Sequence, residues 1–223
     1  DKQIQALTSE ELLAKVRDIL GCQHEIRYYG PASETEAAEL LKANHKIAED
    51  LKPLEKQYIK YLTVDQSKVY LAPYDAKQIR YIQYSNRGEK LDLAADPYLT
   101  LYNEYFGGSM NAIVFQELRE ARGLAYNAWA SYVTPQRTDE TEYYQQHIIS
   151  QNDKMMDCIR VFTEITDTLP QSQTLFATAQ NSLIKTLAAS RTTKFGVISK
   201  YLGAKDMNID YDINRLYFEK VSA

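Results

Sequence analysis

The sequence predicts an α+β fold, a two-layer sandwich in which a mostly antiparallel sheet is covered by helices on one face. The segments 124–133 and 142–151 are rich in aromatic and β-branched residues, and a short polar stretch separates them, which is typical of a β-hairpin. Helical patterns then follow one another without an intervening strand. They cover residues 153–169, 171–189, 194–203 and 212–221.

The length and composition are those of a globular protein. With 223 residues, of which 44% are hydrophobic and 25% charged, the chain is long enough to bury a stable core. We interpret residues 1–223 as a single domain, with residues 1–22 as a candidate lead-in helix from a preceding domain. The net charge of −4 and the lack of a basic block argue against nucleic acid or membrane contact by this segment.

Two capping boxes organise the N-terminal part of the chain. Residues 8–11 and 33–36 have the spacing at which a Ser or Thr and a Glu bond each other's backbone N–H groups. Gly21 then ends the first helix, because glycine is favoured just past a helix C-terminus. The predicted elements are a helix over 9–20, a strand over 24–29 and a helix from 34 to about 51.

Two strands and a helix are predicted in the middle of the chain. Residues 53–66 are polar and predict a loop. The segments 68–73 and 78–86 have strand composition, and the second alternates between apolar and polar side chains. Pro97 predicts a helix beginning at Asp96, because proline is favoured at the first helical position.

The stretch 103–135 contains the paired glycines and the only tryptophan. Gly107 and Gly108 can take positive φ, so we expect a helix end and a tight reversal there, with Ser109 capping a second helix. The same glycines would also let a substrate backbone approach closely. Gly123 ends the second helix before the strand 124–133. The apolar stripe of that helix consists of Met110, Ile113, Val114, Phe115 and Leu118.

Arg119 and Tyr126 are candidate binding residues on either side of Gly123. Because the chain reverses between them, we expect both side chains to reach the same space. A guanidinium and a phenol offer several donors and almost no base, which suits holding a carbonyl group or stabilising an oxyanion. The alternative is structural, since an arginine in a last helical turn offsets the helix dipole and a strand tyrosine usually packs.

The segment GGSMNAIVFQELREARGLAY at 107–126 resembles the C-terminal half of the pitrilysin/insulinase family of zinc metallopeptidases. The segment HEIRYYGPAS at 24–33 is similar to the strand and turn that open domains of that family. The resemblance implies the two-layer α/β sandwich of pitrilysin and mitochondrial processing peptidase. It also implies that Arg119 and Tyr126 contact a bound peptide opposite the zinc.

The zinc site of that family requires His-x-x-Glu-His on a helix. The histidines here are His24, His45 and His147, and no two of them are close in sequence. His45 with Glu49 one turn further on fits a surface pair. We therefore expect no metal ligand, no cofactor and no catalytic residue in this chain, with zinc bound elsewhere in the full enzyme. The sequence also lacks a Gly-x-Ser-x-Gly elbow and a phosphate-binding loop.

Cys22 and Cys158 are far apart in the sequence and match no metal or redox spacing. Free cysteine behaves as a small apolar residue, so we expect each to be a buried free thiol.

Three hypotheses follow for the function. In the first, the chain is the substrate-binding C-terminal domain of a zinc metalloendopeptidase that hydrolyses peptides or small proteins. Its partners would be a zinc-bearing N-terminal half, on the same chain or a separate subunit, and the peptide substrate. In the second, it is a non-catalytic scaffold or binding subunit of the same fold. In the third, its tyrosine-rich faces line a small-molecule pocket. The compartment stays open between bacterial periplasm and cytoplasm.

Overall fold

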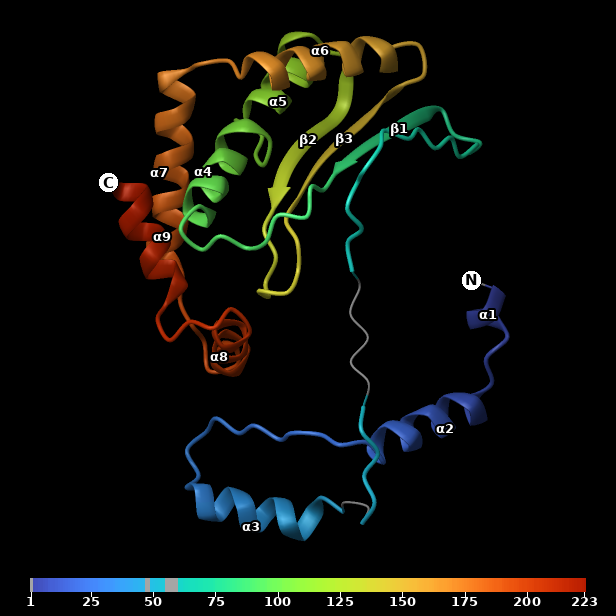
Figure 1. The fold of residues 1–223 in the computed structure, drawn as a ribbon, viewed down its shortest axis with the longest axis vertical. Coiled ribbons are helices and arrows are strands. Elements are labelled where there is room, and N and C mark those ends of the chain that lie inside the picture. Colours follow the sequence, from blue (N-terminus) through green and yellow to red (C-terminus); the bar gives the residue numbers. More distant parts are fainter. Residues whose placement is uncertain (1, 47–48, 55–59) are drawn as a thin grey trace. The chain divides into compact units, whose positions relative to one another are not determined.

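The computed structural model of the chain describes residues 2–46, 49–54 and 60–223, and it confirms the α+β class (Figure 1). The chain separates into two compact units. One comprises Asp1–Ile59 with Thr192–Ser199, and the other comprises Lys60–Arg191 with Lys200–Ala223. The interpretation of 1–223 as one domain with a lead-in helix stays a prediction.

The first unit contains α1 (Lys2–Gln5), α2 (Ser9–Leu20) and α3 (Glu34–Asn44). Both predicted capping boxes are confirmed, since Thr8 bonds reciprocally with Glu11 and Ser33 bonds reciprocally with Glu36. Neither α2 nor α3 has a buried residue. The large apolar side chains of α2 are each more than half exposed: Leu12, Leu13, Val16, Ile19 and Leu20.

Two predictions in this unit are wrong. The second helix ends at Asn44, because His45 has extended backbone angles and residues 45–46 are not helical; residues 47–48 lie outside the described part. Residues 24–29 do not form a strand. The nearest pairing is one isolated bridge between Cys22 and Lys52, and a strand needs a continuous partner to satisfy its backbone groups.

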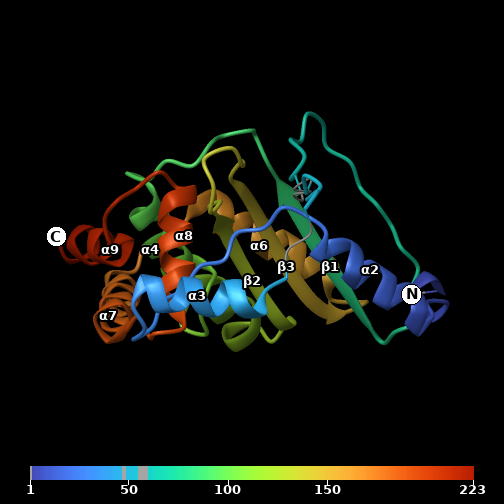
Figure 2. The same cartoon turned by 90° about the horizontal axis from the view of Figure 1, so that it is seen from below.

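The second unit is built on the strands β1 (Gln78–Ser85), β2 (Ala125–Val133) and β3 (Tyr143–Gln151). The sheet order is β1-β3-β2 and both pairings are antiparallel, so β3 is the central strand of the three (Figure 2). The predicted hairpin and the strand at 78–86 are thus confirmed. The strand predicted at 68–73 is wrong, because that segment is unpaired and Val69, Tyr70 and Leu71 are each between 85% and 90% exposed.

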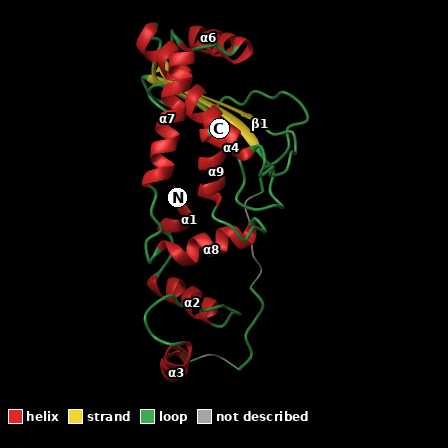
Figure 3. Ribbon diagram, turned by 90° about the vertical axis from the view of Figure 1, so that its left-hand side faces the viewer, coloured by secondary structure: helices red, strands yellow, loops and turns green. Residues whose placement is uncertain are grey.

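Helices cover one face of the sheet. α4 (Asp96–Phe106), α5 (Ile113–Phe115) and α6 (Met155–Thr168) pack on it, and Figure 3 shows the sheet close to edge-on with α6 beside it. The fully buried side chains of this layer include Phe106, Val114, Leu118, Ile148, Cys158 and Phe162. α7 (Gln173–Ala189) and α9 (Ile213–Ser222) add a second apolar cluster with α4. Another helix, α8, spans Gly196–Asp206.

The structure also bears on the cysteines, on membrane-spanning helices and on the predicted loop at 53–66. Cys22 and Cys158 are both free and buried, as predicted. Among the described residues, no helix combines the length and apolarity that crossing a membrane requires. The predicted loop at 53–66 is non-regular where it is described, and residues 55–59 lie outside the described part.

Candidate functional site

The turn at Gly123 joins a helix to the start of β2. Gly123 has φ +57°, which is the left-handed region, and no atom lies within 4 Å of the position of a β carbon. The glycine is therefore required by the backbone conformation and not by crowding. The N–H of Gly123 donates to the Arg119 carbonyl at 3.1 Å, and the N–H of Leu124 donates to the Leu118 carbonyl at 2.9 Å. These bonds fix the helix end and the strand start relative to each other.

Arg119 lies in a π-helical turn, Gln116–Ala121, that continues α5. Such turns are rare in proteins, and those that do occur often lie at functional sites. The Arg119 guanidinium carbon lies 4.8 Å from the centre of the Phe115 ring, and its Nε lies 3.6 Å from a Glu120 carboxylate oxygen. The side chain is 46% exposed. The guanidinium is thus supported on one side by a ring and accessible from the other.

Tyr126 is the extra residue of a β-bulge. Ala125 pairs with Ser150 and Asn127 pairs with Ile149, so Tyr126 has no opposite residue on β3. A bulge changes the direction of a side chain and is frequent next to active sites. Tyr126 is 68% exposed, and its hydroxyl makes no hydrogen bond with the described residues. The phenol is therefore free to bind a ligand.

Arg119 and Tyr126 are both accessible and both outside the core. They lie on the two sides of Gly123, in two different backbone irregularities. Tyr126 lines a pocket at the end of the sheet, whereas Arg119 does not line that pocket and rests on Phe115. The prediction that the two side chains share one space remains a prediction.

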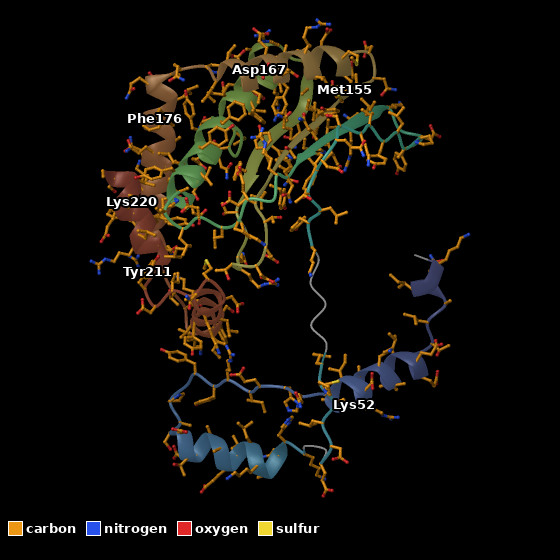
Figure 4. The ribbon with its side chains drawn as sticks, viewed as in Figure 1. Lys52, Met155, Asp167, Phe176, Tyr211 and Lys220 are labelled. Carbon is orange, nitrogen blue, oxygen red and sulfur yellow. The ribbon has the colours of Figure 1, made fainter. Side chains whose placement is uncertain are left out.

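The pocket beside Tyr126 has a volume of about 240 Å³. Its lining residues come from the starts of β1 and β2, the end of β3 and the residue before α6, and Figure 1 shows where these elements lie. Met155, the first residue of α6, is labelled in Figure 4. The pocket is lined by Gln78, Gly123, Leu124, Ala125, Tyr126, Gln151 and Lys154.

Three polar lining residues were not found from the sequence. Gln78 and Gln151 are opposite each other across β1 and β3, and Lys154 immediately precedes α6. The Lys154 ammonium donates to the Gly123 carbonyl at 3.4 Å. None of these three has a motif around it in the sequence, and the strand pairing between distant segments brings the two glutamines together.

Gly107 is the C-cap of α4, as predicted, but neither paired glycine has the positive φ on which that prediction relied. Gly107 has φ −142° and Gly108 also lacks a positive φ. A β carbon on Gly107 would lie 2.4 Å from the Ala130 carbonyl oxygen, and one on Gly108 would lie 2.9 Å from the Asn103 carbonyl oxygen. Close approach of backbone therefore explains both glycines. Their contact with a substrate stays a prediction.

The sequence predicts that Ser109 caps the following helix, and this prediction is wrong. Its hydroxyl donates to the Glu104 carbonyl at 3.4 Å, and α5 begins only at Ile113 after Ala112. Residues 110–112 instead form a turn in which the Gln116 side-chain amide donates to the Met110 carbonyl at 2.7 Å. Met110 is consequently 71% exposed and lies outside the apolar stripe.

The histidines do not assemble a metal site. The Nε2 atoms of His24 and His45 lie 2.7 Å apart, whereas His147 lies in β3. Because α3 ends at Asn44, Glu49 is not one helical turn from His45, so the predicted helical pair does not form. The described residues bring together no group of three or more His, Cys, Asp or Glu side chains that could hold a metal ion. The donor set that zinc requires is thus not present among them.

Comparison with known proteins gives one match to a family and several to solved structures. A sequence model of the peptidase M16 inactive domain matches residues 26–183. No curated protein sequence matches the chain.

Three solved structures have a similar fold. A peptidase M16 inactive domain from Pseudomonas fluorescens aligns with a TM-score of 0.55 and 15% identity, over 66% of this chain and 35% of its own. A protease from Helicobacter pylori aligns with a TM-score of 0.61 and 14% identity, over 99% of this chain and 54% of its own. A chain of Complex III2 from Candida albicans, with Inz-5 bound, aligns with a TM-score of 0.54 and 17% identity, over 87% of this chain and 47% of its own. At these identities the likeness shows the fold, and this chain spans about 35–54% of the length of each.

Proposed function

The chain belongs to the peptidase M16 inactive-domain family, and we propose that it is the substrate-binding domain of a zinc-dependent metalloendopeptidase. In this proposal another part of the enzyme, on the same polypeptide or on a second subunit, binds the zinc. This chain would contact the peptide and hold it in position for cleavage.

The observation that carries the proposal is the placement of Arg119 and Tyr126. Each lies in a local departure from regular structure, and the two departures flank the Gly123 turn. The Tyr126 phenol is exposed and has no hydrogen-bond partner among the described residues, and the Arg119 guanidinium is half-exposed, so both groups are accessible to a ligand. A guanidinium and a phenol are both hydrogen-bond donors, and a peptide carbonyl is an acceptor that suits them.

The chemistry of the two groups is that of positioning and charge stabilisation. A guanidinium has five N–H donors in a planar fork, and a phenol adds one O–H donor. Held beside a scissile carbonyl, they fix its orientation and stabilise the negative charge that develops on its oxygen. This chain would supply no proton-accepting group and no nucleophile.

The test is hydrolysis of a peptide by the full-length protein together with its zinc-bearing half. We expect Arg119→Ala to lower kcat/KM by roughly 10- to 1000-fold, the effect of losing one positioned donor. The matched control is Arg122→Ala, because Arg122 is a neighbouring exposed arginine that pairs with Glu117 at 3.2 Å. Equal kcat/KM values for the two variants would remove the assigned role of Arg119.

A second candidate is a non-catalytic scaffold subunit, and the fold likeness to a chain of Complex III2 favours it. The two candidates differ in whether a zinc-binding His-x-x-Glu-His helix accompanies the chain. Zinc content and peptide hydrolysis of the complex purified with this chain distinguish them. A complex without zinc and without hydrolysis supports the scaffold.

A further inference from the structure

We propose that the pocket beside Tyr126 binds a carboxylate of the peptide substrate, and that Lys154 sets this preference. The inference rests on the proposed function, because it names the chemical class of substrate that the same surface would select. It depends on the pocket and its lining, which belong entirely to the second unit.

The lining of the pocket contains one charged residue, and it is a cation. Lys154 is the only charged residue among those that line it, and no carboxylate lines it. The other polar side chains are the amides of Gln78 and Gln151 and the phenol of Tyr126. Each of these can donate a hydrogen bond without adding negative charge.

The Lys154 ammonium keeps donors available for a ligand. Its side chain is half-buried, and among the described residues it has no ion-pair partner. Its one hydrogen bond is to the Gly123 carbonyl, at the long distance of 3.4 Å. An ammonium group has three donors, so further donors remain for an anion. The contact with Gly123 also places the cation beside the turn that separates Arg119 from Tyr126.

The size of the pocket fits a small group. A volume of about 240 Å³ accommodates one side chain or a chain end, and not a folded partner. A carboxylate there would accept a charge-assisted hydrogen bond from Lys154 and neutral ones from the phenol or an amide. The carboxylate can come from an Asp or Glu side chain or from a peptide C-terminus, which have the same chemistry.

The experiment compares binding of three peptides of one sequence to the full-length protein, with zinc removed so that they are not cleaved. One peptide has an internal Glu and an amidated C-terminus, the second has Gln there and a free C-terminus, and the third has Gln and an amidated C-terminus. We expect one of the two carboxylate peptides to bind about 3- to 10-fold more tightly than the neutral one at low salt. The tighter one identifies the source of the carboxylate.

Lys154→Gln is expected to abolish this preference, so that the carboxylate peptides bind no more tightly than the neutral one. Lys154→Arg should retain most of it, because the positive charge remains. Lys185→Gln is the matched control, since Lys185 is an exposed lysine on α7 that does not line the pocket. Increasing ionic strength should reduce the preference of the parent protein, as screening requires.

The outcomes separate this inference from the proposed function. If the neutral peptide binds but neither carboxylate peptide binds better, the inference is overturned and the proposed function is untouched. A preference that persists in Lys154→Gln overturns the role of Lys154 in the same way. If none of the peptides binds, the proposed function fails, and the inference with it.

Discussion

Gly107 and Ala130 bring the end of α4 into direct backbone contact with β2. The N–H of Ala130 donates to the Gly107 carbonyl at 3.2 Å, and a β carbon on residue 107 would lie 2.4 Å from the Ala130 carbonyl oxygen and 2.6 Å from its nitrogen. Ala130 is itself 1% exposed and belongs to the apolar cluster between the sheet and the helices. The helical layer is thus attached to β2 at a point where no side chain fits.

Gly107→Ala should therefore destabilise the protein strongly. The clash is with backbone, which cannot rotate away, so we expect the free energy of unfolding to fall by about 3 kcal/mol. Gly203→Ala is the control, because no atom lies within 4 Å of its β-carbon position and it lies inside α8. There alanine should stabilise by about 0.5–1 kcal/mol. Chemical denaturation of both variants measures the difference, and similar values would contradict the close packing at Gly107.

Asn103 joins the same two elements by side-chain hydrogen bonds. Its amide donates to the Tyr132 carbonyl at 2.8 Å, and its oxygen accepts from the Tyr132 N–H at 2.7 Å. Asn103→Ala removes both bonds and leaves two strand backbone groups without partners, so we expect a loss of about 1–3 kcal/mol in unfolding free energy. The exposed Asn111 makes no such bonds, and Asn111→Ala should change stability by less than about 0.5 kcal/mol.

Local signals in the sequence were sufficient for the elements that depend on neighbouring residues. Thr8 with Glu11 and Ser33 with Glu36 form their capping boxes because those contacts span three residues. Gly123 has the expected left-handed conformation for the same reason. By contrast, the segments 24–29 and 68–73 have strand composition but no partner strand among the described residues, and composition alone does not supply one.

The candidate site was predictable only in part. The sequence identified Arg119 and Tyr126 through their resemblance to a family, but nothing in it indicates the π-helical turn or the β-bulge in which they lie. Lys154 and Gln78 were missed because their proximity depends on strand pairing and on where α6 begins. The predicted reason for a glycine at position 107, a positive φ, was wrong. The actual reason is a contact with β2, more than 20 residues away, which the local pattern does not show.

The hydroxyl of Tyr126 can be tested separately from its ring. Tyr126→Phe should lower kcat/KM for peptide hydrolysis by the full enzyme about 10- to 100-fold if the hydroxyl donates to the substrate. Its stability should not change, because the hydroxyl bonds to none of the described residues. Tyr98→Phe is the matched control, since Tyr98 is an exposed tyrosine on α4 that does not line the pocket. A wild-type kcat/KM in Tyr126→Phe would show that the hydroxyl does not donate to the substrate.

Because of His147, the free energy of unfolding should decrease in mild acid. It lies on the sheet face opposite the helices, between Ile82 of β1 and Trp129 of β2, and its Nδ1 is buried without a hydrogen-bond partner. Burial lowers the pKa of His147 below the ordinary 6.5, and the positive charge of Arg80 lowers it further. In the unfolded chain this histidine therefore takes up its proton at a higher pH than in the folded protein.

The sign of the effect follows from linkage. Well above pH 6.5 His147 is neutral in both the folded and the unfolded state, so it contributes no pH dependence. As the pH falls through 6.5, the unfolded state binds the proton first and the free energy of unfolding decreases. The decrease ends once the pH is below the lowered pKa of the folded state. We expect His147→Gln to remove this part of the decline, as measured by unfolding free energies between about pH 7.5 and 5.5, above the range where carboxylates titrate. Arg80→Gln should reduce the decline without removing it, because burial is the larger cause. A decline in His147→Gln as steep as in the parent protein would contradict the assignment of this pH dependence to His147.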